Sequence, residues 1–311
     1  MDLYSQPVKP RLSSMRLNEH PSGTLRGGLQ GGLRCTLSSL SGLEAAMTAI
    51  DLPPVRRLIR PDPGFVLVDA DFDRADAQAV AWYADEPELK HVFQTGVDIH
   101  QENAAWIYYP SEWTYNTPLA FSKVTPDQRQ RSKNGIHLTD YGGKARTLAS
   151  TLNTTVHRAE EFQSYWFDRF PGIKRWHTSV DQRLRLAHCV YNVWGFRRFY
   201  FDRIDTKTLL PQALAWLGQS TIAVAINKAM LRVHHELPEA QLLLQNHDSL
   251  LMQVPARLAP AIFPVILDTM RVKVPFDDPL FIPLSLKWSE ESWGQMRKWS
   301  PPAAKEINRA A

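Results

Sequence analysis

The sequence predicts an α+β fold in which an antiparallel sheet is combined with a large set of helices. Three observations carry this prediction. A strand pattern occupies residues 65–69, a mostly helical pattern runs from about 77 to 190, and two apolar strands joined at His247-Asp248 follow a long helix. A chain of 311 residues that is 44% hydrophobic can form one large domain or two connected ones.

Composition excludes several classes of protein. The net charge of +4 is compatible with a polyanionic partner but is too small to predict one alone. Cys35 and Cys189 are the only cysteines, and their spacing predicts neither a zinc site nor a disulfide framework. The N-terminus has no signal-peptide pattern, and no segment reaches transmembrane length by its pattern. We therefore expect no membrane association and a cytoplasmic location, in a bacterial or phage-infected cell.

The first 50 residues have a loop-rich pattern. A glycine-rich stretch, GTLRGGLQGGLR, precedes a serine-rich piece, TLSSLSG, and only residues 42–50 suggest a short helix. From Val55 onward the pattern predicts a turn at Pro61–Gly64, a strand over Phe65–Asp69 and a helix that begins near Arg74.

Three carboxylates alternate at the exit of this strand. Asp69, Asp71 and Asp73 follow i, i+2 spacing, which on a strand places them on one side. Carboxylates this close repel one another unless a cation is bound, and oxygen ligands of this kind suit Mg²⁺. A solvated acidic turn that caps the following helix is the alternative interpretation.

Aromatic residues are dense in the second half of the helical region. Between residues 156 and 176 they follow a helical period and comprise Phe162, Tyr165, Trp166, Phe167, Phe170 and Trp176. Such a set is far more often a packed core than a base-stacking surface, so we predict a core. Pro171-Gly172 predicts a loop that ends this helix.

One helical segment carries cations first and an aromatic residue last. Arg129, Lys133, His137 and Tyr141 recur every fourth residue, so on a helix their side chains share one face. A nucleoside triphosphate has negative phosphates at one end and a flat base at the other, and this face could contact both. A solvated basic face on a surface helix is the alternative interpretation.

The C-terminal half combines a short hairpin, a long helix and the apolar strand pair. YNVWGFRRFYFD predicts two strands bent at Gly195, with Arg197 and Arg198 just beyond the bend as candidate phosphate contacts. A helix is predicted over Gln212–His235. At the tip of the strand pair, His247-Asp248 indicates either a simple turn or a functional site.

Together these segments resemble the family A DNA polymerases over residues 55–296. Asp71, Phe72 and Asp76 occupy the positions of the family's motif A, with Asp76 where Glu is usual. Motif B is matched by Arg129, Lys133, Tyr141 and Gly142, and His137 replaces its usual aromatic residue.

Motif C and several shorter marks follow in the family's order. His247 and Asp248 match motif C, which departs from the family at Ser249. The shorter marks are DIH at 98–100, FPG at 170–172, GFRR at 195–198, Gln219 and SWG at 292–294. The resemblance implies template-directed DNA synthesis.

The resemblance also implies a right-hand architecture, with a palm on an antiparallel sheet and helical fingers. We expect the palm at 51–90 and 206–300, the fingers at 91–205, a loop-rich remnant at 1–50 and a flexible tail at 301–311. Fifty residues leave no room for the family's thumb or 3′–5′ exonuclease domain. We therefore expect a divergent phage-type enzyme, one half of a split polymerase whose other chain supplies the missing part, or a fragment.

Roles for single residues follow from the resemblance. Two Mg²⁺ ions would be held by Asp71, Asp248 and the carbonyl of Phe72, and Lys133 would protonate the leaving pyrophosphate. The dNTP would be contacted by Asp76, His100, Arg129, Lys133, His137 and Tyr141. Primer–template DNA would be contacted by Arg197, Arg198, Gln219 and His247.

Two other functions stay open. Phage-type single-subunit RNA polymerases share the palm, and their motif C commonly reads His-Asp-Ser, as it does here at Ser249. Asp76 and the DIH motif favour the DNA enzymes, because the acidic residue helps to exclude a ribose 2′-OH. An inactive nucleic-acid-binding accessory protein of replication is the third interpretation. The intact Asp71, Lys133 and Asp248 oppose it, and the missing thumb favours it.

Overall fold

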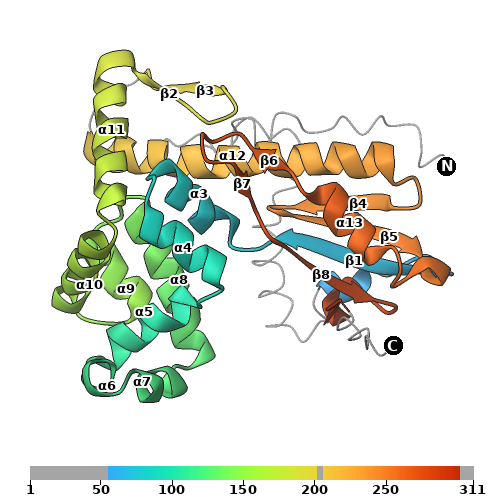
Figure 1. Ribbon diagram of the computed structural model, residues 1–311, viewed down its shortest axis with the longest axis horizontal. Helices are drawn as coiled ribbons and strands as arrows, with labels where there is room; N and C mark the ends of the chain where they lie inside the picture. The colour runs from blue at the N-terminus through green and yellow to red at the C-terminus, as the bar shows by residue number, and fades with distance from the viewer. Residues whose placement is uncertain (1–54, 202–205, 302–311) are drawn as a thin grey trace, which may run out of the picture. The chain divides into compact units, whose positions relative to one another are not determined.

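The computed structural model describes residues 55–201 and 206–301 (Figure 1). The predicted remnant at 1–50, with its helix at 42–50, and the predicted tail beyond residue 301 lie outside these described residues. The chain divides into two compact units, which we describe separately. Unit 1 comprises residues 1–73, 223–273 and 281–311, and unit 2 comprises residues 74–222 and 274–280. The assignment of palm and fingers to particular residues stays a prediction.

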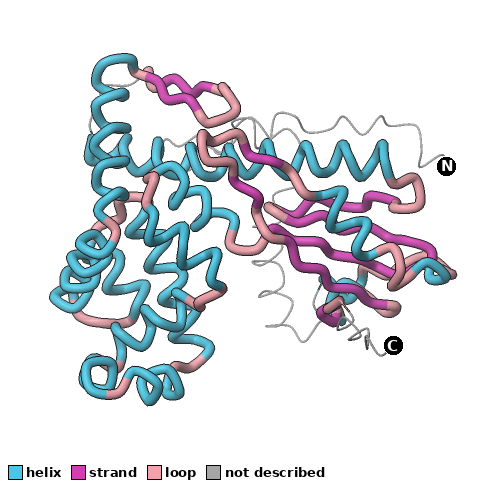
Figure 2. The backbone as a smooth tube through the Cα atoms, viewed as in Figure 1, coloured by secondary structure: helices cyan, strands magenta, loops and turns pink. Residues whose placement is uncertain are grey.

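Unit 1 is built on a five-stranded antiparallel sheet (Figure 2). The strand order is β4 (Gln241–Asn246), β5 (Ser249–Pro255), β1 (Phe65–Phe72), β8 (Leu284–Ser289) and β9 (Arg297–Lys298). The predicted strand pair therefore exists as β4 and β5, joined at His247-Asp248. With the helices of both units, this sheet confirms the predicted α+β class.

The central strand β1 is longer than predicted. The prediction ended at Asp69, but Asp71 still pairs with Ser249 of β5 and Ser285 of β8. Neighbours on both sides supply backbone hydrogen bonds, so the strand continues through residues whose polarity suggested a turn. Side chains alternate between the two faces of a strand, so Leu67 lies on the same face as Asp69 and Asp71. On this face Leu67 packs against Leu251 and Trp293.

Short elements complete unit 1. The helix α13 (Phe263–Met270) packs against β8, where the rings of Phe263 and Trp288 are 5.6 Å apart. The others are the 3-10 turns η1 (Val55–Leu58), η2 (Ala256–Leu258) and η3 (Trp293–Gln295). The strands β6 (Lys273–Val274) and β7 (Leu280–Phe281) form a small two-stranded sheet whose residues are divided between the two units.

Unit 2 is mostly helical, as the pattern predicted. Its helices, in chain order, are α3 (Ala75–Tyr83), α4 (Pro87–Thr95), α5 (Ile99–Tyr108), α6 (Pro110–Tyr115), α7 (Thr117–Lys123), α8 (Pro126–Asp140), α9 (Ala145–Leu152), α10 (Val156–Arg169) and α11 (Pro171–Ala187). The predicted hairpin is present as β2 (Cys189–Tyr191) and β3 (Arg197–Phe199). Helix α12 (Thr206–Glu236) contributes residues to both units.

The aromatic residues of α10 form the predicted core. Phe162, Trp166 and Phe170 are fully or almost fully buried, and the last two rings meet at 4.7 Å. The loop predicted at Pro171-Gly172 is wrong, because these residues begin α11. Proline is tolerated in the first helical turn, where its missing N–H would have no helical partner.

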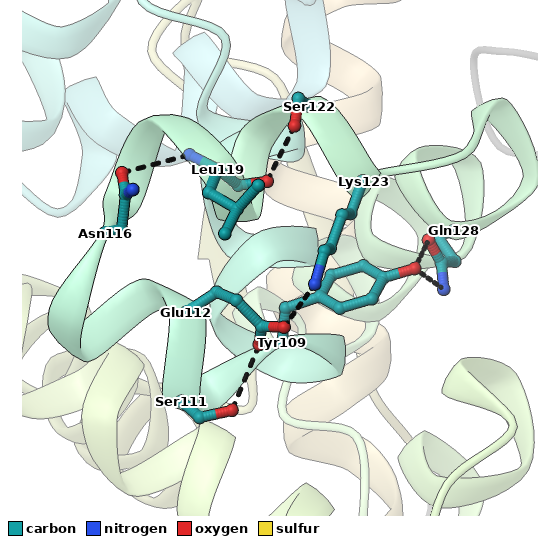
Figure 3. A network of polar contacts seen from close by, with 8 residues as sticks. All are labelled: Tyr109, Ser111, Glu112, Asn116, Leu119, Ser122, Lys123 and Gln128. Atoms are coloured by element: carbon teal, nitrogen blue, oxygen red, sulfur yellow. Dashed lines mark hydrogen bonds and ion pairs between the residues drawn. The ribbon is translucent and has the colours of Figure 1, made fainter.

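A polar network joins α6 and α7 to the start of α8 (Figure 3). Lys123 forms an ion pair with Glu112, and Ser122 Oγ donates to the carbonyl of Leu119 at 2.8 Å. The hydroxyl of Tyr109 contacts the side chain of Gln128 at 3.2 Å. Exposed pairs of this kind stabilise little by themselves, but the last contact anchors the residue that caps α8.

Helix α12 is longer than the predicted Gln212–His235, because Pro211 lies inside it without ending it. Its stretch Thr208–Glu236 is long and apolar enough to cross a membrane by length and composition, which the sequence pattern did not suggest. However, 67% of the most apolar window is buried inside the protein. A buried helix of this kind is typical of a protein core.

Candidate active site

An acidic cluster lies in unit 1, where β1 ends beside β5. Asp71 pairs with Ser249 in the strand register, so the turn residue Asp248 is its neighbour. The amide of Phe72 donates to the carbonyl of Asp248 at 3.1 Å, which joins the two backbones at this point. Two aspartates 177 positions apart in the chain, Asp71 and Asp248, are thereby brought together.

Asp69 and Asp73 lie beside this pair and have partners of their own. Asp69 Oδ2 accepts a hydrogen bond from Trp293 Nε1 at 2.8 Å. Asp73 Oδ1 accepts one from Ser285 Oγ, also at 2.8 Å. The predicted row of three carboxylates is therefore present, and the partners of Asp69 and Asp73 orient them.

Negative charge accumulates around Asp71. Burial, followed by the charges of Asp248, Asp69 and Asp73, raises its pKa to about 7, although the charge of Lys287 lowers it. The cluster therefore favours either a proton or a metal cation at this position.

The donor set fits a divalent cation such as Mg²⁺. Within residues 55–201 and 206–301, no three His, Cys, Asp or Glu side chains converge as a complete metal cage. Mg²⁺ does not require one, because it commonly uses one or two carboxylates and completes its shell with substrate phosphates and water. Asp71 and Asp248, with excess negative charge around them, meet this requirement.

The turn between β4 and β5 holds a strained residue. His247 has a left-handed backbone, with φ at 53°, and its side chain is exposed. Left-handed residues other than glycine are uncommon, although His adopts this conformation more often than most. Ser249, where the resembling family has Glu, is buried and donates its hydroxyl to the carbonyl of Asn246 at 3.2 Å. This serine therefore stabilises the turn.

Helix α8 in unit 2 carries the predicted row of cations. It begins with a capping box, in which Thr125 Oγ1 accepts from the amide of Gln128 and Gln128 Oε1 accepts from the amide of Thr125. It ends at Asp140, Tyr141 caps it, and the following Gly142 has a φ of 74° that suits glycine. The defined ends fix the row Arg129, Lys133, His137 and Tyr141, as the four-residue spacing predicted.

Arg129 has a carboxylate partner in this structure. Its Nε donates to Asp98 Oδ2 at 2.7 Å, and the other oxygen of Asp98 caps α5 by accepting from the amides of His100 and Gln101. Burial raises the pKa of Asp98, but these donors outweigh burial and hold it below its usual value. A phosphate would have to compete with Asp98 for Arg129.

Two histidines lie close together here: His100 of α5 is buried, and His137 of the row is half-buried. The rings of His100 and His137 are 6.5 Å apart, and neither ring nitrogen of His100 has a hydrogen-bond partner among the described residues. Burial, followed by the charge that His137 carries when it is protonated, lowers the pKa of His100 to about 3. Burial, followed by the charge of Lys133, lowers that of His137 to about 4. Both rings are therefore neutral at pH 7 and can donate hydrogen bonds without adding positive charge.

Lys133 is the cation of the row that is most available to a ligand. It lies half-buried one turn after Arg129 and forms no ion pair with any residue in the described part of the chain. A lysine in this position can meet a phosphate without first breaking a protein contact.

A cavity of about 410 Å³ in unit 2 collects four of the predicted contact residues. They are Asp76 of α3, His137 of α8, Tyr141 directly after α8, and Gln219 of α12. The hydroxyl of Tyr141 is buried without a hydrogen bond to any described residue. Burial, and then the charge of Asp76, raises its pKa well above the usual value.

Close packing positions Tyr141. A Cβ atom on Gly218 of α12 would lie 2.7 Å from the Tyr141 hydroxyl oxygen, so only glycine allows this approach. A buried, unpaired hydroxyl beside a carboxylate in a cavity of this size can recognise a polar ligand.

Arg197 and Arg198 lie on β3, apart from this cavity. They alternate on the strand, so that Arg197 is exposed and Arg198 is half-buried. Their guanidinium groups lie over the rings of Phe199 and Tyr200, at 4.9 and 5.1 Å respectively. The predicted contact with DNA phosphates stays a prediction.

Sequence reasoning missed residues that hold the candidate residues in place. Asp98 was visible in the DIH motif, but its contact with Arg129 spans 31 positions and has no local signal. Asp69 was part of the acidic row. Its partner Trp293 lies in the SWG motif, to which the sequence assigned no role.

Comparisons with known proteins concern the chain as a whole. The family model described as DNA polymerase family A matches residues 45–295. The thermostable DNA polymerase I of Thermus filiformis is 28% identical over 233 residues, covering 73% of this chain and 27% of that protein. That of Thermus aquaticus is 27% identical over 240 residues, covering 75% and 28%. The chain thus spans about a quarter of the length of these relatives.

A solved structure is also similar. It is the POL domain of Pol1 from M. smegmatis in complex with DNA primer-template and dNTP, with a TM-score of 0.64 and 24% sequence identity. The match covers 77% of this chain and 42% of that chain. At this identity the similarity supports the fold alone.

Proposed function

Since the chain belongs to DNA polymerase family A, we propose that it catalyses template-directed DNA synthesis. The reaction transfers a nucleotidyl group from a dNTP to a primer 3′-hydroxyl. The observation that carries the proposal is the meeting of Asp71 and Asp248 at adjoining strand ends of one sheet. Two aspartates so placed suit the metal-assisted transfer of a phosphoryl group.

Asp71, Asp248 and the carbonyl of Phe72 are the proposed ligands of two Mg²⁺ ions. When bound, such ions lower the pKa of the attacking hydroxyl and neutralise charge on the leaving pyrophosphate. The chain's part is to orient the carboxylates, which the register of β1 and β5 supports. Lys287 of β8 lies opposite Asp69 of β1 in the strand register, and its positive charge offsets part of the negative charge around Asp71.

The cations of α8 are proposed to contact the triphosphate. Lys133 is the proposed proton donor to pyrophosphate, because an ammonium group can release a proton and a guanidinium cannot. Arg129 would bind phosphate after its contact with Asp98 is exchanged. His100, as a neutral ring, would donate a hydrogen bond and would not supply charge.

The cavity of unit 2 is proposed to hold the nucleoside end and the template base. Asp76 and the Tyr141 hydroxyl would exclude a ribose 2′-hydroxyl, His137 would lie against the sugar or base, and Gln219 would contact DNA. His247 at the turn and Arg197 and Arg198 on the hairpin are the other proposed DNA contacts. The predicted phage-like origin and the predicted thumb-supplying chain add nothing to this proposal and stay predictions.

RNA synthesis is the second candidate, and Ser249 is the observation that favours it. An inactive accessory protein is the third, and it is opposed by the presence of Asp71, Asp248 and Lys133. The ranking follows from Asp76, because a carboxylate in the nucleoside cavity disfavours a 2′-hydroxyl.

Primer extension by the purified chain with Mg²⁺ tests these candidates. Parallel reactions would contain dNTPs or rNTPs, and Asp71→Asn would control for contaminating polymerases. We expect extension with dNTPs only. Preference for rNTPs would favour the RNA enzyme, and no extension with either would favour the accessory protein.

A further inference from the structure

The hairpin β2–β3 of unit 2 presents aromatic side chains to solvent. In its register Tyr191 lies opposite Arg197, and Cys189 lies opposite Phe199, so these side chains share one face. Tyr191 is 47% exposed, Phe199 43% and Phe201 91%. The other face of the hairpin is packed, since Val190 and Tyr200 are buried. Cys189 on the first face is also buried, so core packing accounts for it and for the second face but not for the exposed rings of the first face.

The exposed aromatic rings are ordered relative to one another. The rings of Phe199 and Phe201 are 5.9 Å apart with an interplanar angle of 24°, so they are nearly parallel. The guanidinium of Arg197 lies 4.9 Å from the centre of the Phe199 ring. A row of flat rings flanked by a guanidinium offers stacking surfaces and positive charge together.

The hairpin is anchored, so this face is presented in a fixed place. The amide of Val193 donates to the hydroxyl of Tyr83 at 2.9 Å, and Trp194 Nε1 donates to the carbonyl of Thr221 at 3.0 Å. Asn192 Nδ2 donates to Ser220 Oγ at 3.0 Å. Rigid aromatic groups lose little conformational freedom when they bind a ligand.

We propose that the face formed by Tyr191, Arg197, Phe199 and Phe201 binds single-stranded DNA by stacking its bases. Resting on the proposed polymerase function, the strand would be the unpaired template. Charge complementarity selects this occupant, because the face carries the exposed Arg197 and residues 189–201 contain no acidic residue. Stacking also tolerates any base sequence, since every base has a flat face. A polymerase that copies any template requires that tolerance.

The test is binding of a fluorescent oligo-dT strand of about 12 nucleotides, a length within the range of known single-strand sites. Binding would be measured by anisotropy with EDTA and without nucleotide. An abasic strand of equal length keeps the phosphates but has no bases to stack. We expect Phe201→Ala to weaken oligo-dT binding about 5-fold or more and to leave abasic binding unchanged.

Matched variants separate base stacking from a general loss of aromatic surface and from self-association. Tyr115 of α6, in the same unit, is 88% exposed, so Tyr115→Ala removes an equally exposed aromatic ring and should change neither affinity. Phe201→Trp keeps a stacking ring and should retain oligo-dT binding. If Phe201→Ala binds both strands as the wild type does, the proposal is overturned. Self-association through this face is the other outcome that overturns the proposal. It would appear in sedimentation as a concentration-dependent dimer. Phe201→Ala would then abolish the dimer without changing the affinity for DNA.

The outcome is separable from that of the proposed function. Binding is measured without catalysis, and primer extension is measured on the wild-type chain. If the wild type extends primers and Phe201→Ala binds oligo-dT as tightly as the wild type, only the proposed stacking face is contradicted. If the wild type does not extend primers and Phe201→Ala binds oligo-dT more weakly than the wild type, only the proposed polymerase function is contradicted.

Discussion

Asp140, the last residue of α8, is a buried acid whose ionisation should make the stability of the protein depend on pH. It is 1% exposed, and its Oδ1 accepts a hydrogen bond from Trp166 Nε1 at 2.8 Å. Burial raises its pKa to about 7, although the bond from Trp166 lowers it. Asp140→Asn keeps the shape and an oxygen acceptor for Trp166 while removing the charge.

The direction and size of the effect follow from linkage. The folded state holds the proton more tightly than the unfolded state, where the pKa is near 3.8, so stability falls as the pH rises toward 7 and levels off above it. A shift from 3.8 to about 7 corresponds to about 4 kcal/mol in full. Between pH 5 and 8 it amounts to about 2.5 kcal/mol of unfolding free energy.

Urea unfolding at several pH values between 5 and 8 measures this effect. We expect the wild type to lose about 2.5 kcal/mol more than Asp140→Asn across that range. The change with pH is the readout, so a constant cost of burying the amide does not disturb it. Asp168, a surface carboxylate whose side chain is 71% exposed, serves as the control in Asp168→Asn and should keep the wild-type slope. An Asp140→Asn variant with the wild-type slope would refute the reasoning.

Three further predictions concern the proposed chemistry. Asp71→Asn and Asp248→Asn should each lower primer extension at least about 100-fold and abolish any Mg²⁺-dependent rise in melting temperature. Asp71→Asn should also melt no earlier than the wild type in EDTA, because it relieves carboxylate repulsion, and earlier melting would contradict this. Lys133→Ala should slow the single-turnover rate of chemistry about 100-fold. Arg129→Ala should mainly raise the KM for dNTP, about 10-fold. If neither variant changes the kinetics, this row of α8 is only a solvated surface and does not bind the nucleotide. Asp76→Ala should raise rNTP incorporation relative to dNTP about 10-fold, and an unchanged ratio would place sugar selection elsewhere.

Local patterns predicted the elements well where two signals agreed. The strand pair around His247-Asp248, the hairpin bent at Gly195 and the aromatic core at Trp166 each combine a period with a turn or a composition signal. The errors occurred where a prediction depended on one signal. Pro171 suggested a loop and instead begins a helix, and the strand predicted to end at Asp69 instead continues to Phe72.

Contacts across the sequence could not be predicted from pattern. Nothing local to Arg129 indicates Asp98 as its partner, and nothing local to Asp69 indicates Trp293. The protonation of His100 is a further case. The sequence led us to expect a contact with the dNTP at His100, but it could not show that burial keeps the ring neutral. Partner choice and burial are properties of the folded chain, and they decide what each candidate residue can do.

Asp140 and Asp71 both have raised pKa values, but the physical causes of the two shifts differ. Asp140 owes its shift to burial alone, and the hydrogen bond that its side chain accepts from Trp166 is neutral and lowers the pKa, so no cation is required nearby. Asp71 owes part of its shift to three neighbouring carboxylates, and a bound cation would relieve that part of the cost. A raised pKa alone therefore does not mark a catalytic acid. The cause of the shift distinguishes them, and by that criterion Asp71 is the residue whose environment calls for a metal ion.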